Sequence, residues 1–231
     1  MYWNAPDNLD DTWQYNLNTN TWTNMSPPVS PPARFGQVMT YDNKAGVVIL
    51  FGGGMLTCTT GQHVWPILFN DTWIYNVSEN NWTNMDPEIS PPARIWSEMA
   101  YDSTYDVHVL FSGEHDSYPW DKPDTWTYNS SQNTWTEVNC TQSPPGRCNY
   151  AMAFNSREER VFIFGGEPDP GVALYNDTWE FDFENKTWNQ LNLVTQPTVR
   201  TGHSMVYDSA NDAIILYGGW ASCTWAYGCN G

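Results

Sequence analysis

One pattern of residues occurs four times in this chain of 231 residues, and it restricts the fold more than any other feature. Each copy begins with Asp-Thr-Trp and ends with an apolar run followed by small residues, spanning 11–53, 71–113, 124–166 and 177–219. Every copy also holds a second tryptophan, an arginine and a methionine in the same order. The arginines are Arg34, Arg94, Arg147 and Arg200, and the methionines are Met39, Met99, Met152 and Met205. The copies are 60, 53 and 53 residues apart, a period typical of a propeller or a repeat array.

Each copy contains four short strand candidates separated by turn-forming residues. In the second copy, residues 99–101 and 107–111 are apolar or alternating, and the segment between them is rich in turn formers. A third strand is predicted over 124–128 and a fourth over 134–138. Because no long window has a 3.6-residue apolar period, the sequence predicts an all-β fold.

The aromatic content indicates how such sheets bury their faces. The chain has 14 Trp, 13 Tyr and 9 Phe, and side chains of this size can fill the space between sheets that are stacked radially. An arginine that recurs in register is better explained by structure than by a surface charge. We therefore expect its guanidinium group to donate hydrogen bonds to loop carbonyls between sheets.

The repeat resembles the kelch repeat at three places. A diglycine follows the second strand (Gly52-Gly53, for example), an aromatic residue lies in the third strand, and a tryptophan opens the fourth. The aromatic residues are Tyr15, Tyr75, Tyr128 and Phe181, and the tryptophans are Trp22, Trp82, Trp135 and Trp188. The resemblance covers nearly the whole chain, with Ser112 in place of one glycine. It implies a β-propeller of four-stranded kelch-like blades over residues 1–231, and very little about chemistry.

The phase of the repeat leaves the number of blades open. The chain starts in the third strand of one blade and ends after the second strand of another. One alternative is a self-closed ring of four blades, in which the strand around Ile215 pairs with the strand around Trp13. The others are a part of a larger propeller and an oligomer whose blade edges pair between chains.

The charge of the chain argues against two classes of partner. A formal net charge of −17, with 9 basic and 26 acidic residues, disfavours nucleic acid and anionic membranes. The sequence contains no stretch of 18 apolar residues, so it does not predict direct insertion into a membrane. No cofactor is expected other than covalent N-glycans.

The sequence also favours an extracellular or cell-surface location. Asn-X-Ser/Thr sequons exceed the number that composition predicts, although the repeat itself multiplies any coincidence. Candidate glycosylation sites are Asn24, Asn70, Asn76, Asn81, Asn129, Asn139, Asn176 and Asn185. Because residues 1–10 carry no apolar signal-peptide core, we expect the chain to be a portion of a longer precursor.

Five cysteines are consistent with that location. Cys140 and Cys148 lie eight residues apart between two sheets, which is compatible with a local disulfide. Cys58 and Cys223 would occupy equivalent loops of neighbouring blades in a closed ring, and Cys223–Cys229 is the competing pair. Buried free thiols are the alternative to both arrangements.

Strand directions predict that the long loops and the linkers lie on one end of the propeller. The loops are residues 54–69, 114–123, 167–175 and 220–231, and the linkers are 26–32, 86–92 and 141–145. Aromatic and histidine side chains outside the repeat pattern are candidates for contact with a protein or a glycan, or for small satellite cores. These candidates are His63, Trp65, His115, Tyr118, Trp120, Trp220, Trp225 and Tyr227.

Residue patterns for catalysis or metal binding are weak. No histidines and cysteines have ligand spacing, and no serine lies in a nucleophile context. The sequence therefore predicts a non-enzymatic module of an extracellular glycoprotein that binds a protein or a glycan. The alternatives are the propeller domain of a secreted carbohydrate-active oxidase or hydrolase, and a self-assembling surface-layer or filament subunit.

Overall fold

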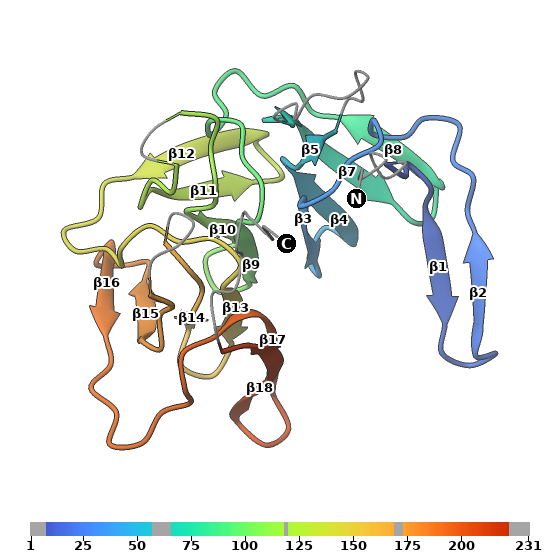
Figure 1. Ribbon diagram of the computed structural model, residues 1–231. Coiled ribbons are helices and arrows are strands. Elements are labelled where there is room, and N and C mark those ends of the chain that lie inside the picture. Colours follow the sequence, from blue (N-terminus) through green and yellow to red (C-terminus); the bar gives the residue numbers. More distant parts are fainter. Residues whose placement is uncertain (1–7, 57–65, 118–119, 169–172, 222–231) are drawn as a thin grey trace, which may run out of the picture.

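The computed structural model describes residues 8–56, 66–117, 120–168 and 173–221, and it is all-β. Three four-stranded antiparallel sheets, the complete blades, are arranged side by side around a common axis (Figure 1). The first strands of neighbouring blades contact one another, so they form the inner wall around the axis. The predicted all-β propeller architecture is confirmed.

The strands of the complete blades fall where the repeat predicts them. The first blade consists of β3 (Val38–Asp42), β4 (Val47–Phe51), β7 (Thr72–Asn76) and β8 (Asn81–Asn84). The second consists of β9 (Glu98–Asp102), β10 (Val107–Phe111), β11 (Thr125–Asn129) and β12 (Thr134–Val138). The third consists of β13 (Ala151–Asn155), β14 (Arg160–Phe164), β15 (Thr178–Asp182) and β16 (Thr187–Gln190). Within each blade, consecutive strands pair antiparallel from the inner strand outward.

Two further hairpins are half-blades. β1 (Trp13–Asn16) and β2 (Thr21–Asn24) correspond to third and fourth strands, whereas β17 (Thr201–Asp208) and β18 (Ala213–Trp220) correspond to first and second strands. Each hairpin forms a separate two-stranded sheet.

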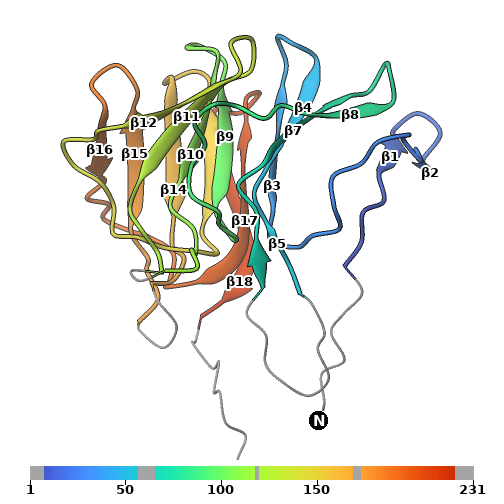
Figure 2. The same cartoon turned by 90° about the horizontal axis from the view of Figure 1, so that it is seen from above.

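The self-closed four-bladed ring is therefore wrong for this structure. β17 packs against β13 of the third blade, and Trp82 of the first blade donates a hydrogen bond to Thr12 beside β1. Each half-blade therefore contacts the complete blade next to it in sequence. The rotation between blades is set by the side chains packed between them, and it does not bring β18 to β1. The two half-blades lie apart in both views (Figures 1 and 2).

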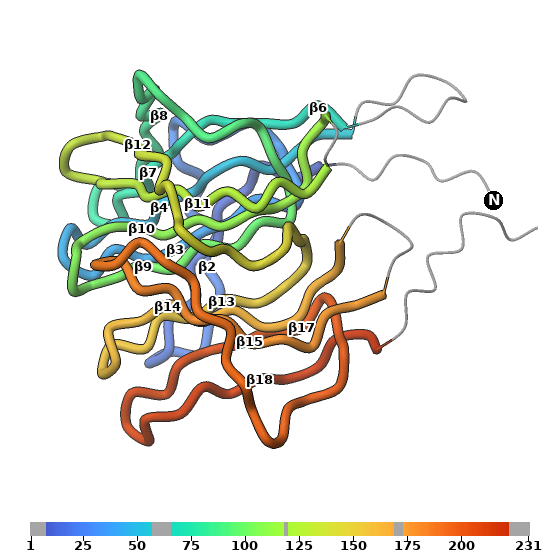
Figure 3. The backbone as a smooth tube through the Cα atoms, turned by 90° about the vertical axis from the view of Figure 1, so that its left-hand side faces the viewer, coloured from blue at the N-terminus to red at the C-terminus, as the bar shows by residue number. Residues whose placement is uncertain are grey.

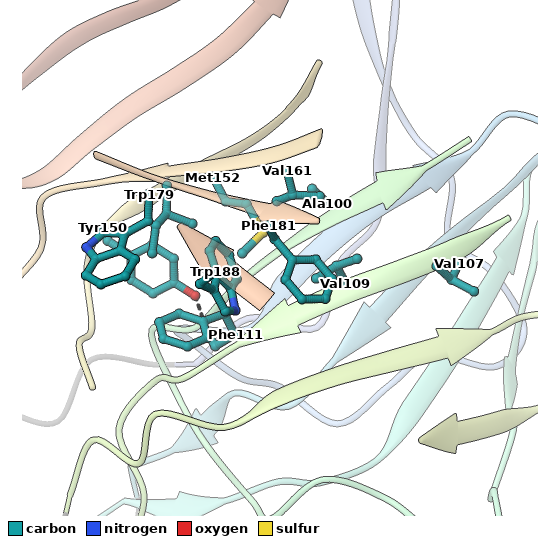
Figure 4. Packing of buried hydrophobic residues seen from close by; sticks show 11 residues of the cluster. Ala100, Val107, Val109, Phe111, Tyr150, Met152, Val161, Trp179, Phe181 and Trp188 are labelled. Atoms are coloured by element: carbon teal, nitrogen blue, oxygen red, sulfur yellow. Dashed lines mark hydrogen bonds between the residues drawn. The ribbon is translucent and has the colours of Figure 1, made fainter. Parts of the chain in front are cut away.

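Aromatic side chains from adjacent blades fill the space between them. Between the second and third blades, Trp188 is fully buried and lies with its ring centroid 5.0 Å from that of Phe111. Its indole nitrogen donates to Thr125 Oγ1 at 3.0 Å, and the Tyr150 hydroxyl donates to the Phe111 carbonyl (Figure 4). Most repeat tryptophans are thus packing residues, as the repeat predicts.

Ser112, the departure from the diglycine pattern, adopts the same left-handed backbone as the glycines that it replaces. Its φ is 44°, compared with 68° at Gly52 and 64° at Gly165. A serine is less favoured than glycine in this region. Its hydroxyl oxygen accepts a hydrogen bond from the Arg147 amide at 2.9 Å, which offsets part of that cost.

The linkers between blades share one end of the molecule with the loops between second and third strands. Backbone bridges join Phe35 to Gly54, Ile95 to Glu114 and Cys148 to Glu167. In the first blade the loop also forms a short hairpin of β5 (Gly54–Met55) and β6 (Ile67–Leu68). The predicted grouping is confirmed for the described parts of these segments, and we call this surface the linker–loop face (Figure 3).

Candidate functional site: the linker–loop face

A buried arginine anchors the linker–loop face in every complete blade. Arg94 donates from Nη1 and Nη2 to the two carboxylate oxygens of Asp124, each at 2.8 Å, and from Nη1 to the Ser112 carbonyl at 2.7 Å. Its Nε donates to the Pro92 carbonyl at 3.1 Å. Asp124 also accepts a hydrogen bond from the Trp126 indole at 2.9 Å. Burial opposes ionisation of Asp124, but hydrogen bonds and charge from Arg94 outweigh it and lower its pKa.

The same clamp recurs at Arg34 with Asp71 and at Arg147 with Asp177. A bidentate arginine–carboxylate pair fixes the relative positions of the linker and the third strand. The hydrogen bonds to loop carbonyls agree with the structural role predicted for the arginine, but the carboxylate partner was not predicted. The signal was present in the sequence, because the aspartate opens every Asp-Thr-Trp copy in the same register.

The structure separates the predicted face residues into different environments. Trp220 is exposed, Trp120 is half-buried, and His115 is 5% exposed, its amide donating to the Trp120 carbonyl at 2.6 Å. Burial, and next the charge of Arg94, lower the pKa of His115 to about 4, so it is neutral at pH 7. His115 thus matches the satellite-core alternative, and its contact with a partner stays a prediction. The other candidates, His63, Trp65, Tyr118, Trp225 and Tyr227, lie outside the described residues.

The hollows on this face are small. One is lined by Leu68, Glu114, His115, Asp116 and Trp120, among others, and encloses about 90 Å³. A second, lined by polar side chains around Asp71 and Asp86, encloses about 220 Å³. Ligand pockets for small molecules usually enclose about 300–1,000 Å³. Both of these hollows are smaller than that range.

Trp96 occupies an unusual position at the inner edge of this face. It lies just before β9, with a left-handed backbone (φ 54°) and a side chain that is 37% exposed. The equivalent positions in the repeat are Gly36, Asn149 and Gly202, all with positive φ. Glycine and asparagine tolerate this conformation, whereas a bulky side chain is a genuine outlier there.

Backbone hydrogen bonds explain why the conformation is fixed at this position. The Trp96 amide donates to the Gly36 carbonyl at 3.0 Å, and the Trp96 carbonyl accepts from the Asn149 amide at 3.2 Å. The Gly202 amide donates in turn to the Asn149 carbonyl at 2.8 Å, so one chain of bonds links successive blades. Trp96 was not among the predicted contact residues. The sequence pattern could have identified Trp96, because this tryptophan is in register with two glycines and an asparagine of the other copies.

Apolar and acidic side chains are exposed together on the linkers. Val29 and Ile89 are 48% and 59% exposed at equivalent positions, and Val194 is fully exposed in the corresponding linker after the third blade. Asp86 and Glu88 are exposed beside Ile89. These are single apolar side chains on three separate linkers, which offer apolar contact points along this face.

The predicted glycosylation sites have a second explanation in turn structure. None of the eight asparagines is buried, but Asn24, Asn76 and Asn129 each use Oδ1 to accept hydrogen bonds from the serine two residues onward. An Asn-X-Ser turn of this kind produces a sequon for structural reasons. The extracellular location, like occupancy of these sites, stays a prediction.

The predicted bridge between Cys140 and Cys148 is not formed in the structure. Cys148 is buried and pairs through its backbone with Glu167, while Cys140 packs against the apolar cluster between the second and third blades. Cys58, Cys223 and Cys229 lie outside the described residues.

Two features that would indicate other functions are absent from the described residues. They contain no group of three or more His, Cys, Asp or Glu side chains that could hold a metal ion. Among the same residues, no helix is long and apolar enough to cross a membrane.

Comparison with known proteins gives a family match and several distant relatives. The Attractin/LZTR1 beta-propeller family model matches residues 2–166, which confirms the kelch-type resemblance. Mei4-dependent protein 6 of Schizosaccharomyces pombe is 25% identical over 207 residues, covering 80% of this chain and 28% of that protein. The leucine-zipper-like transcriptional regulator 1 homolog of Drosophila melanogaster is 22% identical over 237 residues, covering 96% and 22%. Putative adagio-like protein 2 of Oryza sativa subsp. japonica is 28% identical over 179 residues, covering 75% and 26%. The chain spans about a quarter of the length of these relatives.

Proposed function

This chain belongs to the Attractin/LZTR1 β-propeller family, and we propose that it is a protein-binding module whose contact surface is the linker–loop face. The position of Trp96 is the observation that carries the proposal. A tryptophan replaces the glycine or asparagine that the repeat uses in a left-handed backbone, and it is partly exposed at the inner edge of the face.

Backbone strain at Trp96 supports a role for this side chain in binding. A non-glycine residue in a left-handed conformation costs on the order of 1–2 kcal/mol, and such strain is concentrated at functional sites. Phe35 lies next to it, with ring centroids 6.3 Å apart. Tryptophan is also enriched among the residues that dominate binding energy at protein interfaces.

The charge and shape of the face define the chemistry of the partner. The exposed side chains of Val29, Ile89 and Trp96 offer apolar contacts, and Asp86 and Glu88 are exposed in the same linker as Ile89. The chain as a whole carries a net charge of −17, which favours association with a basic surface. A protein with a basic rim around an apolar patch matches these features.

The test compares binding by the wild-type protein with binding by Trp96→Asn, which keeps the turn and removes the indole. Proteins captured from extracts of the source cells are purified and titrated against both forms by calorimetry. We expect Trp96→Asn to raise the Kd at least about tenfold, with the protein still folded. Leu17→Asn is the matched control, because Leu17 is 86% exposed in the turn between β1 and β2 at the opposite end. Equal affinity for wild type and Trp96→Asn, or an equal loss with Leu17→Asn, would contradict the proposal.

A further inference from the structure

A histidine is buried at the junction between the first and second blades. His108 lies on β10 of the second blade, and its side chain is 1% exposed. The first and third blades have Val48 and Val161 at this place in the repeat, and all three residues pair with the aromatic residue of the third strand. An imidazole carries two polar nitrogen atoms. His108 therefore brings polar atoms into a position where the other complete blades have an aliphatic side chain.

Neither nitrogen of His108 has a hydrogen-bond partner among the described residues. Its Nε2 lies 3.6 Å from Oδ2 of Asp42, at the end of β3 in the first blade, which is too long for a hydrogen bond. That carboxylate is already occupied: Oδ2 accepts from Ser130 Oγ at 2.7 Å, and Oδ1 accepts from the amides of Lys44 and Ala45. The junction thus holds a buried imidazole without hydrogen bonds, which lowers its stability.

Charged and titratable groups lie on the elements that pack around His108 from both blades. They are Asp42 and Lys44 of the first blade, and Tyr101, Asp106 and Tyr128 of the second. Asp106 already accepts from the Tyr101 hydroxyl and pairs with Lys44. Burial disfavours the imidazolium more than the charges of Asp42 and Asp106 favour it, so the pKa of His108 is lowered from 6.5 to about 4. The closed junction therefore excludes the proton that a solvent-exposed histidine would bind at about pH 5.

The junction between the second and third blades lacks such a histidine. Val161 stands at the place of His108, and Asp102 at the place of Asp42. Two aromatic rings, those of Tyr105 and Phe183, lie across this junction with their centroids 4.5 Å apart. The two junctions therefore have the same architecture, but a titratable imidazole faces a buried carboxylate in the first and not in the second.

We propose that the junction between the first and second blades is acid-sensitive: protonation of His108 opens it, while the junction between the second and third blades stays closed. Water must reach the imidazole before the proton binds, because burial keeps the closed form neutral. Between pH 6.5 and about 4 the open form binds more protons than the closed form. The closed form is therefore fully stable above pH 6.5 and loses stability as pH falls toward 4. This inference concerns a blade junction, so it does not rest on the proposed function.

A matched pair of buried cysteine substitutions measures the opening of each junction. Ile49 and Val109 occupy the same place in the repeat, and both are fully buried. Ile49 packs in the apolar cluster between the first and second blades, and Val109 packs in the cluster between the second and third. Ile49→Cys and Val109→Cys are labelled with a disulfide reagent that reacts at acidic pH, and peptide mass spectrometry separates each site from the native thiols. Each labelling rate is divided by the rate for the urea-unfolded protein at the same pH.

The expected result is a rise in labelling at one junction. From about pH 7 to about pH 4.5, the relative rate for Ile49→Cys should rise roughly 80-fold, which follows from pKa values of 6.5 in the open form and about 4 in the closed form. The rate for Val109→Cys should change less than about threefold. His108→Val, which introduces the residue of the other complete blades, should abolish the rise in the Ile49→Cys chain. The other buried titratable groups are common to all of these variants, so their titration cancels in the comparison.

Each contrary result would overturn the proposal. Labelling of Ile49→Cys that does not change with pH would show that the junction stays closed. An equal rise in Val109→Cys would show that the whole propeller unfolds, and a rise that survives in His108→Val would assign the opening to other groups. The pKa of His108, followed by NMR in the folded wild-type protein, needs no variant. We expect it well below 6.5, and a value of 6.5 or above would show that the closed junction accommodates the imidazolium.

Discussion

The hairpins β1–β2 and β11–β12 have nearly the same sequence but opposite surroundings. The ring centroids of Tyr15 and Trp22 are 5.0 Å apart, and those of Tyr128 and Trp135 are also 5.0 Å apart. The internal geometry is the same although Trp22 is mostly exposed and Trp135 is buried. The local pair therefore depends on the hairpin sequence, whereas burial depends on the blades on either side.

Truncation of the two tryptophans should give the largest difference between the hairpins. Trp135→Ala removes a buried ring and its hydrogen bond to Thr72, so we expect the free energy of unfolding to fall by about 4–5 kcal/mol. Trp22→Ala should lower it by less than about 1 kcal/mol, because this ring is mostly exposed. Urea unfolding monitored by circular dichroism measures both. Similar losses in the two variants would mean that the exposed hairpin contributes to a core not seen in the structure.

Loss of the repeat arginine should likewise cost more stability in a complete blade than in a half-blade. Arg94→Met leaves Asp124 buried without its guanidinium partner, so we expect a loss of about 3–4 kcal/mol. Arg200→Met, at the half-blade β17–β18, removes solvent-exposed hydrogen bonds to the carbonyls of Thr198 and Gly218 and should cost under about 1 kcal/mol. The measurement is again urea unfolding. The contrast fails if Arg200→Met is as destabilising as Arg94→Met.

Glu98 on the inner strand β9 should make the free energy of unfolding depend on pH, whereas a glutamate in an exposed turn should not. Burial raises its pKa to about 7, from an ordinary value of 4.5, so the folded state favours the protonated form. The resulting stability is present below pH 4.5 and is lost as pH rises through 7.

Glu98→Gln isolates this effect. We expect it to stabilise the protein by about 3 kcal/mol at about pH 8 relative to wild type and to have little effect at about pH 4.5. Unfolding of both proteins across this pH range gives the difference. Glu79→Gln, in the exposed turn between β7 and β8, is the control, and its difference from wild type in the free energy of unfolding should not change with pH. A stabilisation by Glu98→Gln that does not change with pH would exclude the raised pKa as its cause.

Trp96 should give the smallest effect, a gain in stability where the truncations of Trp135 and Arg94 give losses. Trp96→Asn relieves the left-handed strain, and we expect a gain of about 1 kcal/mol in the free energy of unfolding. Asn149→Trp, which introduces the same strain in the third blade, should lose a similar amount. Urea unfolding of both variants gives the two values. A loss of stability in Trp96→Asn would mean that contacts of the indole, with Phe35 for example, outweigh the strain.

The sequence predicted the blades well because their signals are local and repeated. Strand bounds in the second copy, the packing role of the tryptophans and the shared end of loops and linkers all follow from periodicity and turn chemistry. The aspartate partner of each arginine was missed because the two residues are 30 or 37 positions apart, as in Arg94–Asp124 and Arg34–Asp71. Their pairing depends on how a linker meets a third strand.

The candidate site was predicted less completely, because exposure depends on the fold. The sequence marked His115 as a contact residue, but the structure buries it beneath a loop, and it exposes Trp96 instead. Residues adjacent in sequence to a turn can point inward or outward, and only packing against the neighbouring blade decides which.

By itself the sequence determined the blade, since strand alternation, diglycine turns and hairpin aromatic pairs act within about 50 residues. Only the tertiary structure decided that the half-blades do not meet. The rotation between blades comes from side chains packed across each interface, and the sum of these rotations is a property of the whole array.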